Sequence, residues 1–387
     1  MPLKDVTCLI TSVRGGSKLF HYLLDSHPQI VCFPRTLQFD AFWDLIKDNN
    51  KSFETLADIF IEQYPRFFSG EIWKDYNPLD RADLLGEQSD ETFLVDKILF
   101  KNYLIELSKL DVEISSKSVF INLHLAYYKA SRRDLPNNYT ILYHIHALKN
   151  IKSLRFCVND FGLDKTKLIF STKHPLRGMN SILEWMDNVG TKIQNQPAQL
   201  FYYQDEIYLG LSEIKREFPE IDIKILLLEC LIKDKHKYIA NLAQWMDISW
   251  NNSLLKPTIH GKLWWGNAKI KKKGIDKNID KFKPAGFLEK KDWEFIKATF
   301  PLRMIDYGYH NKDDEKIKIF FLIRFVLILL PTHYEYTLIV KYSKRLLFSF
   351  KSLTNKPITY LNNNIKFIVR WFYYYIKRIY LLLTLYK

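Results

Sequence analysis

Residues 6–30, VTCLITSVRGGSKLFHYLLDSHPQI, form the stretch on which the fold depends. The apolar run at 6–10 predicts a buried strand, and apolar residues at 19–24 recur at helical spacing until Pro28 limits the helix. The N–H groups at the start of a helix bind phosphate where glycines let the ligand approach the backbone. The segment therefore predicts a phosphate-bearing ligand. Its turn carries two glycines, a hydroxyl and two basic side chains, namely Arg14, Gly15, Gly16, Ser17 and Lys18.

The turn lacks the pattern of a magnesium-nucleotide site. The loop of nucleotide triphosphatases needs G-x-x-x-x-G-K-[ST], whose last hydroxyl binds magnesium. Here Lys18 is followed by Leu19, and the upstream glycine is missing. The turn resembles instead the 5′-phosphosulfate loop of sulfotransferases that use PAPS (3′-phosphoadenosine 5′-phosphosulfate). In that family a DSHP stretch often follows the first helix, and residues 25–28 read DSHP here.

A second phosphate-type turn lies in residues 167–185, KLIFSTKHPLRGMNSILEW. A short apolar strand precedes a basic turn, and a helix is predicted to begin near Leu176. Sulfotransferases carry Arg-x-Pro here and a Ser eight residues after the Arg, and these two side chains bind the 3′-phosphate. Lys173 holds the basic position, and Ser181 lies eight residues after it. Lys binds phosphate as a point charge and cannot make the bidentate contact of Arg. Arg177, one helical turn before Ser181, can contribute to phosphate binding.

A third segment agrees with the resemblance, which covers roughly residues 5–310. The run IKILLL at 223–228 predicts a buried strand, similar to the family's strand that ends in YEdL, and a helix follows at 238–246. Residues 256–267, KPTIHGKLWWGN, resemble a stretch that many bacterial sulfotransferases carry before a basic loop. The resemblance implies that this loop, at 269–274, closes over the nucleotide. Its predicted contacts are Lys271, Lys272 and Gly274.

The resemblance also implies the catalytic groups. Arg14 is the cation expected to stabilise the bridging oxygen as the leaving group departs. The acceptor hydroxyl needs a base, and many relatives carry a Glu just after the HP pair, but residues 31–36 hold no carboxylate. Cytosolic relatives use a His at the end of the strand before the 3′-phosphate strand. His144 and then His146 are the candidates here, because an imidazole suits base work at neutral pH, and Asp40 is the reserve.

Alternating strands and helices predict an α/β fold with a P-loop-like parallel sheet flanked by helices. Both phosphate-type turns follow strand ends, where such sheets bind their ligands. A helical insert is expected at about 39–135. The other expected elements are helical stretches at 39–67 and 95–129, a loop at 77–92, a strand at 140–146 and a helix at 149–158.

Composition fits one large core with an appendage, because 47% of the 387 residues are hydrophobic and burial is not limiting. The four cysteines are scattered, which predicts reduced core thiols in a cytosolic protein, and their spacing suggests no metal site. No signal peptide or N-terminal membrane anchor is expected, since the first strand begins almost at once. The cysteines are Cys8, Cys32, Cys157 and Cys230.

Residues 312–387 differ from the catalytic domain predicted at 1–311. They hold 14 Lys and Arg against 4 Asp and Glu, a net charge of +10 out of +14 for the chain. The apolar run at 317–330 is too short to cross ~30 Å of hydrocarbon, and residues 365–386 contain four basic residues. This pattern predicts a helix lying in the plane of an anionic membrane surface, on its cytoplasmic face. The alternative is a helical extension packed on the domain or on a second copy of the chain.

The sequence thus predicts a PAPS-dependent sulfotransferase that acts on a hydroxyl of a glycan or glycolipid, without a metal, and a homo-oligomer is compatible with it. Nucleic acid is not an expected partner, because the basic residues are interleaved with aliphatic runs and no nucleic-acid motif occurs. One alternative is another phosphate enzyme, such as a nucleotide kinase, which would need the Lys-Ser/Thr pair that the turn lacks. The other is a non-catalytic nucleotide- or membrane-binding relative.

Overall fold

The computed structural model describes residues 2–11, 15–47, 52–109, 114–147, 151–174, 177–178, 181–182, 211, 213–266, 307 and 309, and single positions at 336, 340, 343–344, 365, 369, 372–373 and 376. Contacts divide the chain into two compact units. The first contains Met1–Thr11, Gly16–Thr172 and Ile214–Asp280, and the second contains Ser12–Gly15, Lys173–Glu213 and Lys281–Lys387. The predicted domains, 1–311 and 312–387, stay a prediction, because most of residues 267–387 lie outside the described part.

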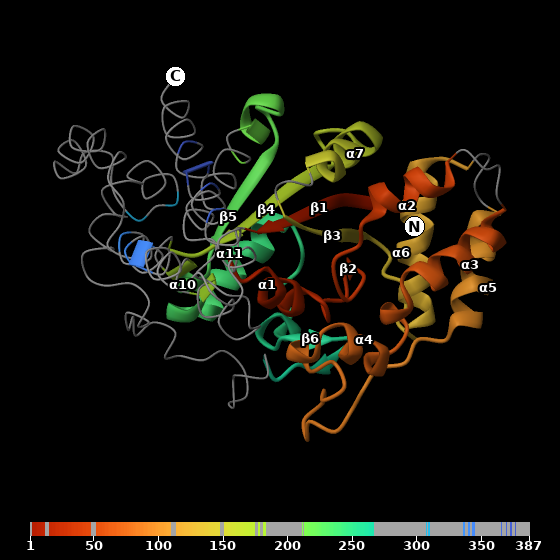
Figure 1. The fold of residues 1–387 in the computed structure, drawn as a ribbon. Coiled ribbons are helices and arrows are strands. Elements are labelled where there is room, and N and C mark those ends of the chain that lie inside the picture. Colours follow the sequence, from red (N-terminus) through yellow and green to blue (C-terminus); the bar gives the residue numbers. More distant parts are fainter. Residues whose placement is uncertain are drawn as a thin grey trace, which may run out of the picture. The chain divides into compact units, whose positions relative to one another are not determined.

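A five-stranded parallel sheet forms the centre of the first unit (Figure 1). Its strands are β1 (Leu3–Thr11), β2 (Ile30–Val31), β3 (Tyr139–Ala147), β4 (Thr166–Thr172) and β5 (Asp222–Leu227). They lie in the order β2-β3-β1-β4-β5. The parallel sheet and its flanking helices confirm the predicted α/β fold.

Helices cover both faces of this sheet, which explains why β1 reads as a nearly continuous apolar run. Successive side chains of a strand point to opposite faces. Leu9 packs with Phe20 in the cluster under α1 (Ser17–Leu24), α10 (Leu228–Lys233) and α11 (Lys235–Met246). Cys8 points to the other face, where it meets Cys157 of α7 (Ile151–Phe161), and Figure 1 shows α7 on the side opposite α1. The strand predicted at 223–228 ends one residue earlier, at Leu227, because Leu228 begins α10.

Five α-helices occupy the predicted insert and gather beside β2 and β3 (Figure 1). The helical stretches expected at 39–67 and 95–129 are each divided, because Ser52 and Ser115 accept backbone hydrogen bonds as N-caps of new helices. Phe33 lies among aromatic rings of the insert, 4.5 Å from Tyr127 and 5.2 Å from Phe67 between centroids. The helices are α2 (Phe39–Ile46), α3 (Phe53–Gln63), α4 (Gly70–Tyr76), α5 (Lys97–Ser108) and α6 (Ser116–Ala130), with short 3-10 helices η1 (Pro65–Phe67) and η2 (Pro78–Asp80).

A small hairpin lies after the 3-10 helix η5 (Asn252–Leu255). Its strands β6 (Thr258–Ile259) and β7 (Lys262–Leu263) pair antiparallel. The two residues between them, His260 and Gly261, both have positive φ, 53° and 76°. This is the geometry of the two-residue turns that match the twist of a hairpin, although His is an unusual residue there.

Candidate functional site

The two predicted phosphate turns follow neighbouring strands of the sheet. Thr11 ends β1 and pairs with Ser171 of β4, and its hydroxyl donates to the Ser171 carbonyl at 3.2 Å. From β1 the chain continues to β2 at one edge of the sheet, and from β4 it continues to β5 at the opposite edge. Open parallel sheets bind ligands at such a reversal, outside the carboxyl ends of the strands. Both turns therefore begin where this fold class places its ligand.

The first turn leads directly into α1. Gly16 is the N-cap of this helix and has φ 87°, in the left-handed region that side chains other than glycine rarely adopt. A Cβ at Gly16 would also lie 3.1 Å from Leu228 Cδ1. Ser17 begins the helix and is buried, as is Gly15. The first N–H groups of α1 are thus presented by the predicted turn, whereas Arg14 lies outside the described residues.

Lys18 makes a contact that the sequence analysis did not foresee. Its ammonium donates to Asp80 Oδ1 at 2.5 Å, and Asp80 is fully buried at the end of η2. The same carboxylate lies 3.3 Å from Arg35, and it accepts from Trp73 Nε1 at 3.3 Å and Asn77 Nδ2 at 3.1 Å. The charge predicted for phosphate contact at Lys18 is therefore balanced by a carboxylate of the insert. Asp80 stands 62 residues away in the expected loop, so no local pattern marks it.

The second turn brings its two principal residues together. Lys173 Nζ donates to Ser181 Oγ at 2.6 Å, so the two groups predicted for the 3′-phosphate are adjacent. Gly178 N–H donates to the His174 carbonyl at 2.9 Å, and Arg177 and Gly178 are helical, as expected for this segment. Arg177 is half-buried. A phosphate placed here would meet an ammonium and a hydroxyl at one point.

The candidate bases lie on β3, where the strand is irregular. His144 pairs with Leu9 and His146 pairs with Ile10, so Ile145 is an extra residue, a β-bulge. His144 is 3% exposed, and its ring centroid lies 5.2 Å from that of His21 in α1. Burial lowers the pKa of His21 to about 4. The side chain of His146 lies outside the described residues.

Asp40, the reserve base, has a contact within the helical layer. Its carboxylate accepts from Ser153 Oγ at 2.8 Å, which joins the start of α2 to α7. Asp40 is half-buried. This contact gives Asp40 a role in packing the helices.

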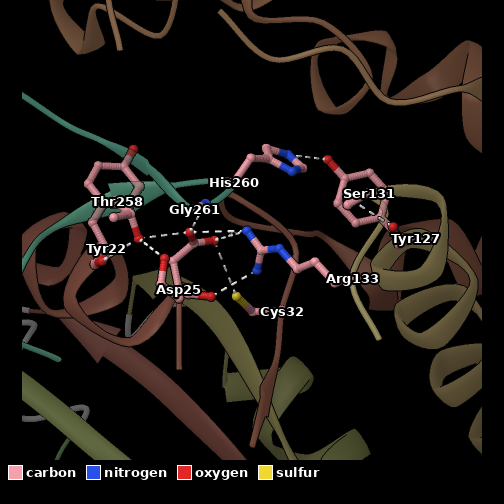
Figure 2. Close-up of polar contacts among 10 residues, drawn as sticks. Tyr22, Asp25, Cys32, Tyr127, Ser131, Arg133, Thr258, His260 and Gly261 are labelled. Carbon is pink, nitrogen blue, oxygen red and sulfur yellow. Dashed lines mark hydrogen bonds and ion pairs between the residues drawn. The ribbon is translucent and has the colours of Figure 1, made fainter. Parts of the chain in front are cut away.

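The DSHP stretch holds a buried ionic cluster (Figure 2). The Asp25 carboxylate lies 3.3 Å from Arg133, and it accepts from Thr258 Oγ1 at 3.0 Å and from the Gly261 N–H at 2.9 Å. Burial would raise the pKa of Asp25, but Arg133 and the other positive and N–H groups around the carboxylate outweigh it and hold the pKa below the ordinary value. The DSHP and PTIHG motifs are thus joined through one carboxylate, with Asp25 and Thr258 233 residues apart in the chain.

The hairpin also holds the insert. His260 Nε2 and the Tyr127 hydroxyl lie 2.8 Å apart, and Figure 2 shows the two side chains facing each other. Trp264 Nε1 donates to the Asp80 carbonyl at 2.8 Å, and Trp265 Nε1 donates to the Gly86 carbonyl at 2.5 Å. The conspicuous Trp-Trp pair therefore fixes the position of loop 80–91 beside α1. The basic loop with Lys271, Lys272 and Gly274 lies outside the described residues.

Neither a metal-binding cluster nor a membrane-spanning helix occurs among the described residues. These residues contain no group of three His, Cys, Asp or Glu side chains placed to hold a metal ion. Nor does any helix among them combine the length and the apolar character that crossing a membrane requires. The four cysteines are free thiols, and three of them are buried.

Comparisons with known proteins gave structural likeness alone. No protein-family profile and no curated protein matches the chain. The sulfotransferase domain of the Synechococcus PCC 7002 olefin synthase aligns with a TM-score of 0.38 and 13% identity over 72% of this chain and 82% of that chain. The sulfotransferase domain of the curacin biosynthetic pathway gives 0.41 and 15% over 73% and 87%, and a Mycobacterium avium sulfotransferase gives 0.34 and 12% over 66% of each chain. Because these scores and identities are low, function is inferred below from the residues of this chain.

Proposed function

We propose that the protein is a PAPS-dependent sulfotransferase that transfers a sulfuryl group to a hydroxyl of a glycan or glycolipid. The observation that carries the proposal is the placement of two phosphate-type turns after the neighbouring strands β1 and β4, with Lys173 and Ser181 hydrogen-bonded at 2.6 Å. In the reaction the acceptor oxygen forms a bond to sulfur, and the bond from sulfur to the bridging phosphate oxygen breaks. The products are a sulfate ester and 3′,5′-ADP.

The residues of the two turns receive separate roles in this proposal. The backbone of Gly15–Ser17 and the start of α1 bind the 5′-phosphosulfate, because helix N-termini favour negative oxygens. Arg14 stabilises the charge that develops on the leaving oxygen, and Lys173 with Ser181 binds the 3′-phosphate. The hydroxyl proton passes to a base at the end of β3, with His144 ranked first and His146 second. The chain's own cations supply the charge stabilisation, and no step needs a metal.

Lys173→Ala is expected to weaken binding of 3′,5′-ADP by more than tenfold and to leave 5′-AMP binding nearly unchanged. A charge-assisted contact typically contributes about 1.5–3 kcal/mol, and only 3′,5′-ADP has the phosphate that Lys173 would hold. Isothermal calorimetry without magnesium on both ligands measures the difference. Lys237→Ala, at an exposed lysine of α11, is the matched control. Equal losses for the two ligands would remove Lys173 from the 3′-phosphate site.

A thermal-shift panel with 3′,5′-ADP, ATP with magnesium and AMP, together with a transfer assay, separates the alternative functions. A nucleotide kinase would be stabilised by ATP with magnesium more than by 3′,5′-ADP. A non-catalytic relative would bind 3′,5′-ADP and fail to transfer labelled sulfate from PAPS to any hydroxyl acceptor. Selective stabilisation by 3′,5′-ADP together with transfer supports the sulfotransferase.

The proposal includes attachment to an anionic lipid surface through residues 365–376. Five described positions there are helical, at Ile365 and at residues 369, 372, 373 and 376, which are four, seven, eight and eleven further on. This spacing places them on one face of a helix, and each side chain is 48–61% exposed. In the sequence a basic residue directly follows three of them, at Lys366, Arg370 and Lys377. An exposed apolar stripe bordered by positive charge matches the boundary between lipid headgroups and acyl chains.

Full-length protein is expected to co-sediment with phosphatidylglycerol vesicles and much less with phosphatidylcholine vesicles. Added salt should weaken this binding without abolishing it, because only the electrostatic part is screened. The double variant Val369→Ser/Ile376→Ser should bind at least tenfold more weakly, since each lost side chain removes on the order of 1 kcal/mol of apolar burial. Ile98→Ser, at a residue of α5 that is 72% exposed, is the control. Unchanged binding of the double variant would contradict the lipid assignment, as would a wild-type chain that forms dimers through the stripe and ignores vesicles.

A further inference from the structure

Three cations gather where the helical insert meets the start of α1. They are Lys18 of α1, Arg35 after β2 and Arg66 of η1. Asp80 pairs with both Lys18 and Arg35. Arg66 has no carboxylate within ion-pair distance among the described residues, and its buried Nε has no hydrogen-bond partner there. Among the described residues, Asp80 is thus the carboxylate that forms ion pairs in this cluster, and it brings one negative charge to three cations.

Aromatic rings hold the two guanidinium groups in place. Arg35 lies over the Trp73 ring at 5.2 Å, and Arg66 lies over the Phe67 and Tyr76 rings at 5.6 Å each. The Phe33 and Phe67 rings, 5.2 Å apart, bring together the two segments that carry Arg35 and Arg66. Burial lowers the pKa of Arg66, and the nearby positive charge of Arg35 lowers it further. The positive charges of the cluster therefore repel one another, and a bound anion would relieve this repulsion.

The unpaired N–H donors of a guanidinium favour a particular kind of ligand. A guanidinium offers five N–H donors in a planar fork that matches a carboxylate or phosphate, and desolvated donors without acceptors cost free energy. The side chain of Arg35 is 21% exposed, so solvent reaches the cluster. The ring contacts of Arg66 by themselves fit a role in ligand binding and a role in packing equally well. Among the described residues no acceptor meets the buried Arg66 Nε, and this favours the ligand.

The cluster adjoins the predicted reaction centre. Lys18 directly follows Ser17 of the phosphosulfate turn, and it shares Asp80 with Arg35. The donor occupies the strand ends in the proposed function, so the acceptor approaches from another side. Arg35 shares Asp80 with Lys18 of α1, and Arg66 of the insert lies near Arg35.

We propose that Arg35 and Arg66 bind an anionic oxygen group of the acceptor, a carboxylate or an ester phosphate, and so select acidic glycans or glycolipids. This inference rests on the proposed sulfotransferase function, whose acceptor class it narrows. Asp80 acts in it as a positioning residue that fixes Arg35 and Lys18. The hydroxyl to be sulfated belongs to the same acceptor molecule. Binding of the anionic group by Arg35 and Arg66 positions this hydroxyl for the reaction.

The test uses three forms of one tetrasaccharide: glucuronate-containing, carboxyl-reduced and phosphorylated. The wild-type chain is expected to bind at least one charged form about ten- to hundredfold more tightly than the reduced form, the range that a charge-assisted contact supplies. Arg66→Gln should remove most of this preference, Arg66→Lys should retain part of it, and both should bind 3′,5′-ADP like wild type. Arg155→Gln, at an exposed ion pair of α7 with Glu217, is the matched control.

The two proposals fail separately in this experiment. A wild-type preference for charged forms that persists in Arg66→Gln at an unchanged melting temperature overturns the role of Arg66. Equal binding of all three forms by wild type, with intact 3′,5′-ADP binding, overturns the acidic acceptor and leaves the sulfotransferase standing. Loss of 3′,5′-ADP binding by wild type overturns the sulfotransferase, whatever the tetrasaccharides show.

Discussion

Asp25→Ala is expected to lower the free energy of unfolding by about 3–5 kcal/mol, the typical cost of leaving one member of a buried ion pair without its partner. Arg133 would remain, with a side chain 18% exposed, and lose the carboxylate 3.3 Å away. Thr258 and the Gly261 N–H would lose their acceptor as well. Because the hairpin is held to α1 through these bonds, its contacts with the insert should loosen together with the cluster.

Urea unfolding at pH 7 measures this effect, and two variants control it. Asp25→Asn keeps an acceptor but loses the charge, so it should fall between wild type and alanine. Asp58→Ala removes an exposed ion pair with Lys101 and should cost less than about 1 kcal/mol. If Asp25→Ala cost no more than Asp58→Ala, the cluster in Figure 2 would not hold the fold together.

The first strand and helix could be predicted because their pattern is local. Buried residues of β1 adjoin one another, and the helical repeat of α1 spans 8 residues that begin at the predicted turn. The proximity of Lys173 to Ser181 was predictable for the same reason, since the two lie eight residues apart on one segment, while phosphate binding there stays a prediction. A parallel sheet then follows from the alternation of strands and helices, with connections that obey the handedness of such folds.

The polar clusters could not be predicted, because their partners are far apart in the chain. Asp25 meets Arg133 across 108 residues and Thr258 across 233, and Lys18 meets Asp80 across 62. No spacing rule links such residues, so the sequence gives no sign that Asp25 of the DSHP stretch holds the hairpin, as the structure shows. The bulge at Ile145 could not be predicted from the sequence either, because it depends on the pairing of β3 with β1.

The second large effect concerns pH, and it arises chiefly from three histidines, of which His21 and His124 are buried and His260 is half-buried. Burial lowers the pKa of His21 and His124 to about 4 and that of His260 to about 3. In the unfolded chain a histidine has a pKa of about 6.5. Between these values the unfolded chain binds protons that the folded chain does not, so stability falls as the pH falls.

We expect the free energy of unfolding to drop by on the order of 5 kcal/mol between pH 7 and pH 5. One such histidine contributes about 1.4 kcal/mol per pH unit once the pH is well below 6.5, and three contribute about 4. This is comparable with the whole stability of many domains, about 5–15 kcal/mol. Urea unfolding at pH 7, 6 and 5 measures the slope. His124→Gln should lower it by about a third, and His236→Gln, at an exposed residue of α11, should leave it unchanged.

This pH dependence bears on how the base of the proposed reaction can be identified. A fall in turnover below pH 6 would ordinarily point to protonation of a base such as His144. Here we expect the fold itself to lose stability over the same range through His21, His124 and His260. An acid limb that shifts in His124→Gln, a residue packed 4.7 Å from Phe33 in the insert, would report unfolding. An acid limb that stays in place in His124→Gln and disappears in a folded His144 or His146 variant would report the base. A limb that follows neither histidine would turn the search to Asp40.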